Sequence, residues 1–282
     1  MARVAVVTDS TAYLPADVAA AHHLTVVPLT VVLGGREGLE GVDITPTDVA
    51  QALVARRGTV STSRPSPADF EAVYRRLLDA GATGIASVHL SSKLSGTHEA
   101  AVLAAQSCRG AIDVIDGQSA GMGIGFAALD AARSAAGGAD LDDVGAAARA
   151  GVGRTSVLFY VDTLEHLRRG GRIGAASALL GTALSVKPIL HVSDGTIVVR
   201  DKVRTASRAL ARMVDLAVET AGDSDVDLAV HHLDAPERAQ QIETAMVARL
   251  GDKVHDTYTS EIGAVVAAHV GPGLVSIVVH RR

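Results

Sequence analysis

Two loops rich in hydroxyl groups are candidates for holding an anion. One is SSKLSGT at residues 91–97, between an apolar run that ends at Leu90 and a helical pattern, and the other is TSRPS at residues 62–66, in the same setting. At the carboxyl end of a strand in an open α/β sheet, hydroxyls and free loop amides are suited to bind a carboxylate or a phosphate. Helix capping also explains each loop taken alone. The presence of two such loops in one predicted sheet favours a shared anion site.

Arg172 and His269 are the candidate charged groups for such a site. Arg172 follows two glycines in RRGGRI, a backbone-exposed turn from which its guanidinium can point into a cleft. His269 opens HVGPG, a predicted turn between a helix and the last strand, where an imidazole is well placed to donate to an anion. For a lone histidine, a side chain that is exposed or hydrogen-bonded for structural reasons is the simpler interpretation. His269 is therefore a candidate ligand only together with the two loops.

A competing, catalytic interpretation rests on Ser119. The run GQSAG at residues 117–121 matches the G-x-S-x-G pattern of serine hydrolases and lies between a predicted strand and a predicted helix. His269 and an aspartate could complete a triad in the chain order that this fold uses. The sequence lacks a His-Gly-Gly-Gly oxyanion segment and predicts fewer strands than a hydrolase sheet, which disfavours the esterase interpretation.

Composition argues against several other classes of function. The formal net charge of −5 provides no general basic face for nucleic acid, and the aromatic content of 2% leaves little material for stacking on bases. Cys108 is the only cysteine, which excludes an internal disulfide and a multi-cysteine zinc site, and we predict it to be a buried small hydrophobe. The adjacent histidines at 22–23 and 231–232 point apart. We therefore predict no metal and no cofactor.

The charge balance reverses between Leu164 and Arg212. This segment contains nine Lys or Arg and three acidic residues, in a chain that is acidic as a whole. Such a local excess could dock an acidic partner or a nucleotide phosphate, although a solvated helix and hairpin face explains it equally well.

The chain shows no targeting or membrane-spanning pattern. Residues 1–7 enter a predicted strand directly, without the charged and apolar leader of an exported protein. No apolar run reaches the roughly 18 residues that a bilayer span requires. We predict a cytoplasmic protein without stable membrane insertion.

The elements that position these residues predict an α/β protein. In the first half, Val- and Ile-rich runs at 4–7, 24–32, 84–90 and 111–115 alternate with Ala-rich helical patterns, which indicates βαβ units and a mainly parallel sheet. Ser66 and Pro67 are suited to begin a helix, which leaves Thr62 and Ser63 in the loop before it.

The second half predicts a mixed α+β domain. It contains a hairpin around Asp194-Gly195, and the later elements are a helix at 205–221, a strand at 227–233, a helix at 236–250 and a strand at 273–279. A Gly-, Ala- and Asp-rich stretch at 137–154 is the predicted connection. We therefore assign one domain to residues 1–155 and a second to residues 156–282.

The motifs taken together resemble the DegV family of bacterial fatty-acid-binding proteins, which include the carrier subunit of fatty acid kinase. The similarity covers the full chain in order and spacing: TDST at 8–11, TSRPS at 62–66, SSKLSGT at 91–97, RRGGRI at 168–173, KPIL at 187–190, VRT at 203–205 and HVGPG at 269–273. The family usually carries glutamine at the position of Arg64. It often carries serine at the position of Gly117, which suggests that the G-x-S-x-G match is accidental.

The resemblance implies a two-domain fold, with a parallel-sheet N-terminal domain plus a mixed α+β C-terminal domain and a long-chain fatty acid, such as palmitate, stearate or oleate, buried between them. The aliphatic composition suits the acyl tail. The family's carboxylate-binding positions correspond here to Thr62, Ser63, Ser92, Ser95, Gly96, Arg172 and His269.

The resemblance also implies a partner. In the kinase system a separate ATP-binding subunit phosphorylates the carboxylate of the bound fatty acid, and the present chain has no Walker-type loop of its own. We predict that Arg204 and Lys202 help dock that subunit, that the chain has no independent catalysis, and that any membrane contact is transient. A subunit like that of dihydroxyacetone kinase, with its substrate held covalently on a histidine, remains the other alternative. Hydroxyl loops above an aliphatic interior disfavour it.

Overall fold

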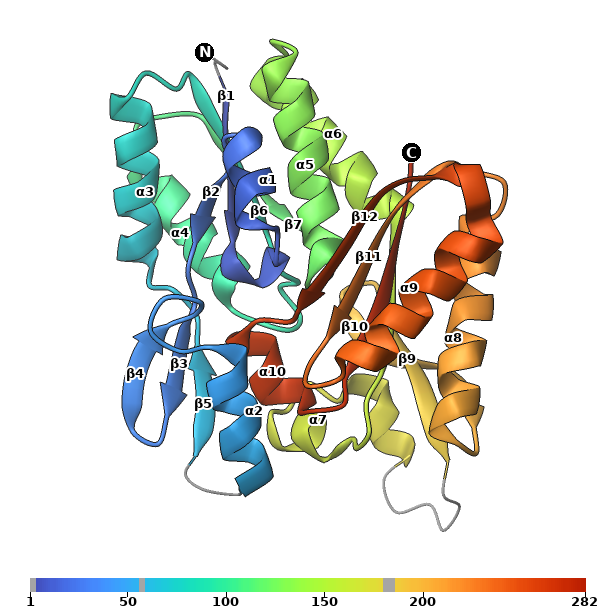
Figure 1. Ribbon diagram of the computed structural model, residues 1–282. Coiled ribbons are helices and arrows are strands. Elements are labelled where there is room, and N and C mark those ends of the chain that lie inside the picture. Colours follow the sequence, from blue (N-terminus) through green and yellow to red (C-terminus); the bar gives the residue numbers. More distant parts are fainter. Residues whose placement is uncertain (1–3, 56–58, 180–185) are drawn as a thin grey trace. The chain divides into compact units, whose positions relative to one another are not determined.

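The computed structural model describes residues 4–55, 59–179 and 186–282 (Figure 1). They form two compact units: unit 1 contains residues 1–30 and 63–153, and unit 2 contains residues 31–62 and 154–282. This division differs from the predicted continuous domains 1–155 and 156–282, because residues 31–62 group with the second half of the chain. Residues 1–3 of the N-terminal stretch considered above lie outside the described residues.

Unit 1 is built on a parallel sheet, as the βαβ pattern predicts. The strand order is β2 (Thr25–Val27), β1 (Val4–Asp9), β6 (Gly84–His89) and β7 (Ile112–Asp116), and every neighbouring pair is parallel. The sheet is accompanied by η1 (Ser10–Ala12), α1 (Ala16–Ala21), α3 (Pro67–Asp79), α4 (Thr97–Ser107), α5 (Met122–Ala136) and α6 (Leu141–Arg154).

The core of unit 1 explains why β6 reads as a continuous apolar run. All six of its residues are buried, as expected for a parallel strand with helices on both faces. On the side of α3 and α4, Phe70, Tyr74 and three alanines of α4 pack against Val7 and Ile85. Ser66 caps α3 as predicted: its hydroxyl accepts from the amide of Asp69, whose carboxylate accepts from the amide of Ser66.

One sequence prediction in the first part of the chain is wrong. The apolar run 24–32 forms two strands, because Pro28 has no amide hydrogen for the ladder and the amide of Leu29 donates to the Ser10 hydroxyl, at 3.0 Å. The stretch 137–154, the predicted connection between the domains, is mainly the helix α6, and the division between the two units falls at its end, after residue 153. Asp140 caps this helix through the amide of Asp143, and Val144 and Ala148 are buried.

Unit 2 contains a mixed sheet of six strands, in the order β10 (Thr196–Val203), β9 (Lys187–Ser193), β8 (Thr155–Tyr160), β13 (Val275–Arg281), β11 (Val226–His232) and β12 (Val254–Glu261). Only the pairing of β11 with β12 is parallel. The predicted hairpin joins β9 to β10 through Asp194 and Gly195, which both have positive φ. Apolar residues of α8 (Ala206–Ala221) and α9 (Pro236–Leu250) cover one face of this sheet.

A smaller sheet in unit 2 consists of β4 (Arg36–Leu39), β3 (Thr30–Leu33) and β5 (Val60–Ser63). The remaining elements of the unit are α2 (Pro46–Ala55), α7 (Glu165–Arg169), η2 (Gly174–Leu179), η3 (Gly251–Lys253) and α10 (Ala264–Val270). Glu40, which is buried, accepts a hydrogen bond of 2.7 Å from the amide of Val265 in the first turn of α10. A carboxylate at that position favours the helix, so the segment 31–62 supports α10.

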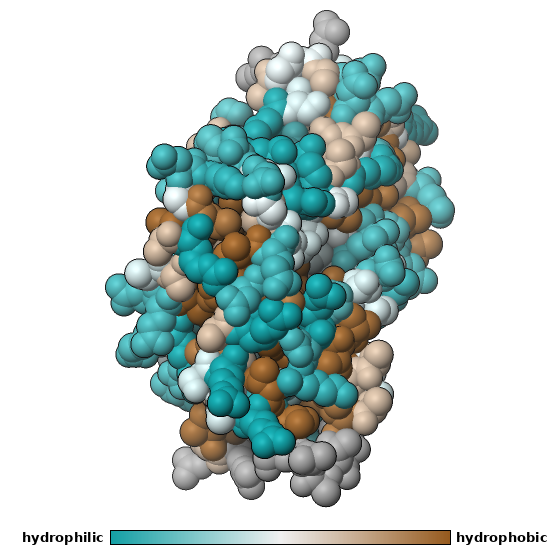
Figure 2. Space-filling model, turned by 90° about the vertical axis from the view of Figure 1, so that its right-hand side faces the viewer, coloured by the Kyte–Doolittle hydropathy of each residue, from teal (hydrophilic) through white to brown (hydrophobic). Residues whose placement is uncertain are grey.

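Within the described ranges, no helix is both long and apolar enough to cross a bilayer. The face drawn in Figure 2 carries hydrophobic residues among hydrophilic ones, which is usual for a folded protein.

Candidate functional site

Thr62 and His269 meet in unit 2, although they lie 207 positions apart in the sequence. The Thr62 Oγ1 atom is 2.9 Å from His269 Nε2. Thr62 lies on β5 and not in the predicted loop, and His269 lies in the last turn of α10 and not in the turn after it. Local sequence patterns do not reveal that the strand that contains Thr62 and the helix that contains His269 meet.

The imidazole of His269 is neutral at physiological pH. Burial lowers the pKa of His269 to about 4, and the nearby positive charge of Arg172 acts in the same direction. The buried Nδ1 atom has no hydrogen-bond partner among the described residues. A neutral imidazole has one N–H group. If the proton is on Nε2, this group has an acceptor, because it donates to the Thr62 hydroxyl. The hydroxyl of Thr62 accepts this bond, so its own proton is available to another acceptor.

Glycines bring the RRGGRI and HVGPG segments together. A side chain at Gly170 would overlap the His269 ring, and one at Gly271, where φ is +74°, would overlap His166. Arg172 donates from Nη1 to the carbonyl of Gly170 at 2.6 Å. The structure thus places Thr62, Arg172 and His269, three of the predicted carboxylate ligands, in one part of unit 2.

The hydroxyl loop of unit 1 presents Ser95 at the start of α4. The Ser95 hydroxyl oxygen accepts from the amide of Thr97 at 3.3 Å and lies 3.0 Å from the Thr97 hydroxyl. Thr97 is fully buried and Ser95 is partly exposed. Ser95 thus accepts a hydrogen bond at the start of α4, although the N-cap residue of that helix is Gly96 and no side chain caps it. This arrangement does not use the proton of the Ser95 hydroxyl when Thr97 donates to that oxygen.

Ser92 and Ser63 have other local partners. The hydroxyl of Ser92 donates to the carboxylate of Asp116 at 2.5 Å, and its amide donates to the same group. An anion beside Ser92 would be repelled by that carboxylate. Ser63 is exposed, and its hydroxyl donates to the carbonyl of Arg64 at 3.3 Å. Among the loop hydroxyls, the geometry thus favours Ser95 and Thr62.

Arg64 links the two hydroxyl loops within unit 1. Its Nη1 donates to the carbonyl of Gly96 at 3.1 Å and to Glu99 at 2.7 Å. A side chain at Gly96 would overlap the guanidinium, so glycine leaves the space in which Arg64 lies. The role of Gly96 in the structure is therefore to accommodate Arg64 before the first turn of α4.

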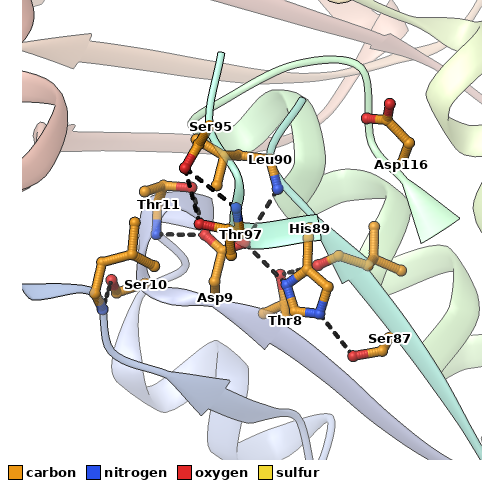
Figure 3. Close-up of polar contacts among 12 residues, drawn as sticks. Thr8, Asp9, Ser10, Thr11, Ser87, His89, Leu90, Ser95, Thr97 and Asp116 are labelled. Atoms are coloured by element: carbon orange, nitrogen blue, oxygen red, sulfur yellow. Dashed lines mark hydrogen bonds and ion pairs between the residues drawn. The ribbon is translucent and has the colours of Figure 1, made fainter. Parts of the chain in front are cut away.

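Asp9 was not among the predicted site residues, although it belongs to the TDST motif. It lies at the end of β1, is fully buried and accepts hydrogen bonds from the residues that precede the hydroxyl loop (Figure 3). A polar residue after the first strand is the only signal in the sequence. That signal does not distinguish a buried carboxylate from an exposed loop residue.

The structure does not support a nucleophilic role for Ser119. In the GQSAG run, Gln118 and not the serine has positive φ, and Ser119 is 8% exposed. The imidazole of His89 bonds Ser87 and Asp9, and that of His269 bonds Thr62. Neither histidine is therefore available to Ser119.

Lys202 and Arg204 are exposed cations at the edge of the six-stranded sheet. Lys202 lies on β10, and Arg204 lies between β10 and α8. Three arginines of the basic segment have acidic partners: Glu165 binds Arg168 and Arg169, which lowers the pKa of Glu165 to about 2, and Asp201 binds Arg212. By contrast, the side chains of Lys202 and Arg204 make no hydrogen bond or ion pair with the described residues.

Metal-ligating side chains do not gather in the described part of the chain. No three His, Cys, Asp or Glu side chains there are close enough together to hold a metal ion.

A family model described as "Uncharacterised protein, DegV family" matches residues 3–282. The chain belongs to the DegV family. A DegV domain-containing protein of Streptomyces coelicolor is 52% identical over 282 residues, which is 99% of both chains, and one of Mycobacterium tuberculosis is 42% identical over 277 residues, 98% of this chain and 96% of its own. The predicted family is thereby confirmed.

Solved DegV structures share this fold. A DegV family protein of Thermus thermophilus, described as binding fatty acid, has 34% identity and a TM-score of 0.94, covering 99% of this chain and 100% of its own. DegV of Bacillus subtilis, described as a fatty acid binding protein, has 31% identity and a TM-score of 0.91, covering 99% of both chains. The predicted α/β fold, a parallel sheet plus a mixed sheet, is confirmed.

Proposed function

We propose that the protein binds a long-chain fatty acid, such as palmitate, stearate or oleate, and holds its carboxylate with the hydroxyls of Thr62 and Ser95. The observation that carries the proposal is the bond between Thr62 and the neutral His269, at 2.9 Å. It uses the hydroxyl oxygen as acceptor and leaves its proton to donate to an anion. The fatty-acid binding described for the Thermus and Bacillus relatives supports the same ligand class.

The other predicted ligands have supporting roles in this proposal. Arg172 adds positive charge near His269, while Gly96 and Ser63 belong to the loops that Arg64 joins. Ser92 contributes least, because its hydroxyl already donates to Asp116. The acyl tail is recognised by aliphatic side chains, at about 0.8 kcal/mol per buried CH₂ group. No cofactor takes part.

The test is native mass spectrometry of protein expressed in a bacterial host, followed by extraction of the ligand. We expect an added mass of fatty-acid size, and binding of palmitate by protein from which lipid has been removed. A covalent adduct of a three-carbon ketone would instead support a subunit like that of dihydroxyacetone kinase. Protein that is empty and does not bind added palmitate or oleate would contradict the proposal.

We further propose that the protein presents the carboxylate to an ATP-binding kinase subunit in the cytoplasm. Lys202 and Arg204 are exposed and have no side-chain partner among the described residues, which supports an acidic docking partner. Arg204→Glu should slow complex formation and depress acyl-phosphate production, while palmitate affinity of the free protein stays unchanged. Arg249→Glu is the matched control, because Arg249 already pairs with Asp215 at another exposed position. Equal loss of lipid binding and phosphorylation in Arg204→Glu would place Arg204 in the fold or the lipid site instead.

A further inference from the structure

The carboxylate of Asp9 accepts four hydrogen bonds in the interior of unit 1. Its Oδ1 accepts from the amide of Thr11 at 3.0 Å and from the Thr11 hydroxyl at 2.5 Å. Its Oδ2 accepts from the amide of Leu90 and from His89 Nδ1, both at 3.0 Å (Figure 3). Asp9, Thr11 and His89 are all fully buried. A buried charge is tolerated in a protein when donors surround it in this way.

These bonds join the ends of two neighbouring strands, β1 and β6, and a backbone bond of Thr11 extends the connection to the segment after β7. Asp9 ends β1, and Leu90 directly follows β6 and precedes the hydroxyl loop. The carbonyl of Thr11 accepts from the amide of Gly121, which follows β7, at 2.8 Å. The hydrogen bonds of Asp9 thus lie at the ends of the strands, directly before the predicted anion-binding loop.

The Leu90 amide is one of the anchors of the turn that contains Ser95, together with the bonds from the Ser91 amide to the Ser119 carbonyl and from Ser92 to Asp116. Ser91 is the next residue, and its carbonyl accepts from the amides of Leu94 and Ser95, both at 3.0 Å. The loop from 91 to 95 is therefore one hydrogen-bonded turn that continues from the residue held by Asp9. Asp9 holds the residue at which this turn begins, so loss of its bond to the Leu90 amide removes the anchor nearest to the start of the loop.

We propose that Asp9 is a positioning residue for fatty-acid recognition: it fixes the start of the hydroxyl loop so that Ser95 faces the ligand carboxylate. This inference rests on the proposed function. Only a carboxylate suits the position, because both of its oxygens accept two donors. An asparagine offers one oxygen, and its NH₂ group would face either the Thr11 amide or the Leu90 amide, which are both donors.

A second branch of the same network leads away from the loop. His89 Nε2 lies 2.7 Å from the Ser87 hydroxyl, which lies 2.8 Å from the hydroxyl of Tyr74 on α3. Tyr74 is as deeply buried as Asp9 and belongs to the apolar cluster under α3 and α4. Tyr74→Phe therefore removes a buried hydrogen bond without changing the bond from Leu90 to Asp9. It is the matched control for Asp9→Asn.

The experiment compares two ligands that share an acyl chain, palmitate and hexadecan-1-ol. Dissociation constants are measured for the parent protein, Asp9→Asn and Tyr74→Phe. We expect Asp9→Asn to bind palmitate at least about tenfold more weakly, with hexadecanol binding within about twofold of the parent. Tyr74→Phe should bind both ligands like the parent, whatever it does to the unfolding temperature.

Each other outcome decides against a stated idea. Equal weakening of both ligands in Asp9→Asn would show a purely structural role, and unchanged binding of both would show that the loop does not depend on Asp9. A parent protein that binds palmitate no better than hexadecanol would refute carboxylate recognition itself, and this inference with it. If Asp9→Asn does not fold, Thr11→Val removes one donor to Oδ1. It should weaken palmitate binding a few-fold and leave hexadecanol unchanged, and any other pattern overturns the proposal.

Discussion

The two hydroxyls proposed to bind the ligand are prepared in different ways in the two units. In unit 1, Ser95 belongs to a loop whose backbone is held by Asp9 and whose hydroxyl oxygen accepts from the amide of Thr97. In unit 2, Thr62 lies on a strand and its hydroxyl accepts from the imidazole of His269. The Ser95 oxygen thus has a backbone amide among its donors, whereas the Thr62 oxygen accepts from a side chain. Side-chain substitution and titration do not remove the amide that donates to Ser95, whereas both can remove the N–H of the imidazole that donates to Thr62. The two units should therefore respond differently to mutation and pH.

The largest expected effect is loss of either hydroxyl. Thr62→Val and Ser95→Ala should each weaken palmitate binding by about 10- to 150-fold, the equivalent of a hydrogen bond of about 1.5 to 3 kcal/mol to a charged group. Isothermal titration calorimetry on delipidated protein measures this change. Ser119→Ala is the matched control and should bind like the parent. If both hydroxyl variants bind palmitate like the parent, neither hydroxyl binds the ligand, and Ser95 and Thr62 have structural roles only.

The double variant sharpens the comparison. If one carboxylate accepts from both hydroxyls, the loss in Thr62→Val/Ser95→Ala should differ from the sum of the single losses by about 0.5 kcal/mol or more. Strictly additive losses would indicate that the two hydroxyls act on separate groups.

A smaller effect is expected from the donor behind Thr62. His269→Ala should weaken palmitate binding about five- to tenfold, because the Thr62 hydroxyl loses the partner that orients it. The amide nitrogen of glutamine can take the place of Nε2, so His269→Gln should retain most of the affinity. An equal loss in both variants would mean that the imidazole does more than donate to Thr62.

Local chemistry explains which parts of the fold were predictable. The parallel sheet, the cap at Ser66 and the Asp194-Gly195 hairpin depend on residues that are close in sequence, and all three are confirmed. The end of the strand at Pro28 also had a local signal, the missing amide of proline. It was outweighed in the prediction by the Val-rich run on both sides.

The site was less predictable, because its contacts are distant in sequence. The hydroxyl loops could be recognised from composition, but no local pattern joins Thr62 to His269 or Asp9 to Leu90. The grouping of residues 31–62 with unit 2 depends in part on Glu40, whose carboxylate binds the first turn of α10. A buried acid that binds a backbone amide has the same sequence pattern as an exposed loop acid.

The pH dependence of stability should separate the two units. The pKa of His269 is about 4 in the folded protein and about 6.5 when unfolded, so the unfolded chain binds more protons between these values. Its contribution to stability is fully present above about pH 6.5 and is lost as the pH falls toward 4. When the pH is lowered from 6.5 toward 4, urea unfolding should show a fall in the free energy of unfolding. This fall should be smaller by about 1 kcal/mol in His269→Gln than in the parent, after allowance for partial exposure of the imidazole. Ser95→Ala in unit 1 should leave the slope unchanged, and identical slopes for parent and His269→Gln would contradict the low pKa.

The smallest expected effect concerns Arg64, where this chain differs from the glutamine usual in the family. The guanidinium is exposed, and its ion pair with Glu99 contributes at most about 1 kcal/mol. Arg64→Gln should therefore lower the free energy of unfolding by less than about 1 kcal/mol. A glutamine amide can still donate to the carbonyl of Gly96, so palmitate affinity should stay within about threefold of the parent. Arg64→Ala removes the side-chain donor to that carbonyl and leaves only the amide of Ala100 as its donor. It should weaken palmitate binding more than Arg64→Gln does, because the residue after Ser95 loses its side-chain contact. If Arg64→Gln proved as harmful as Ser95→Ala, the guanidinium itself would be a ligand of the carboxylate, and unit 1 would recognise the ligand by charge as well as by its hydroxyl.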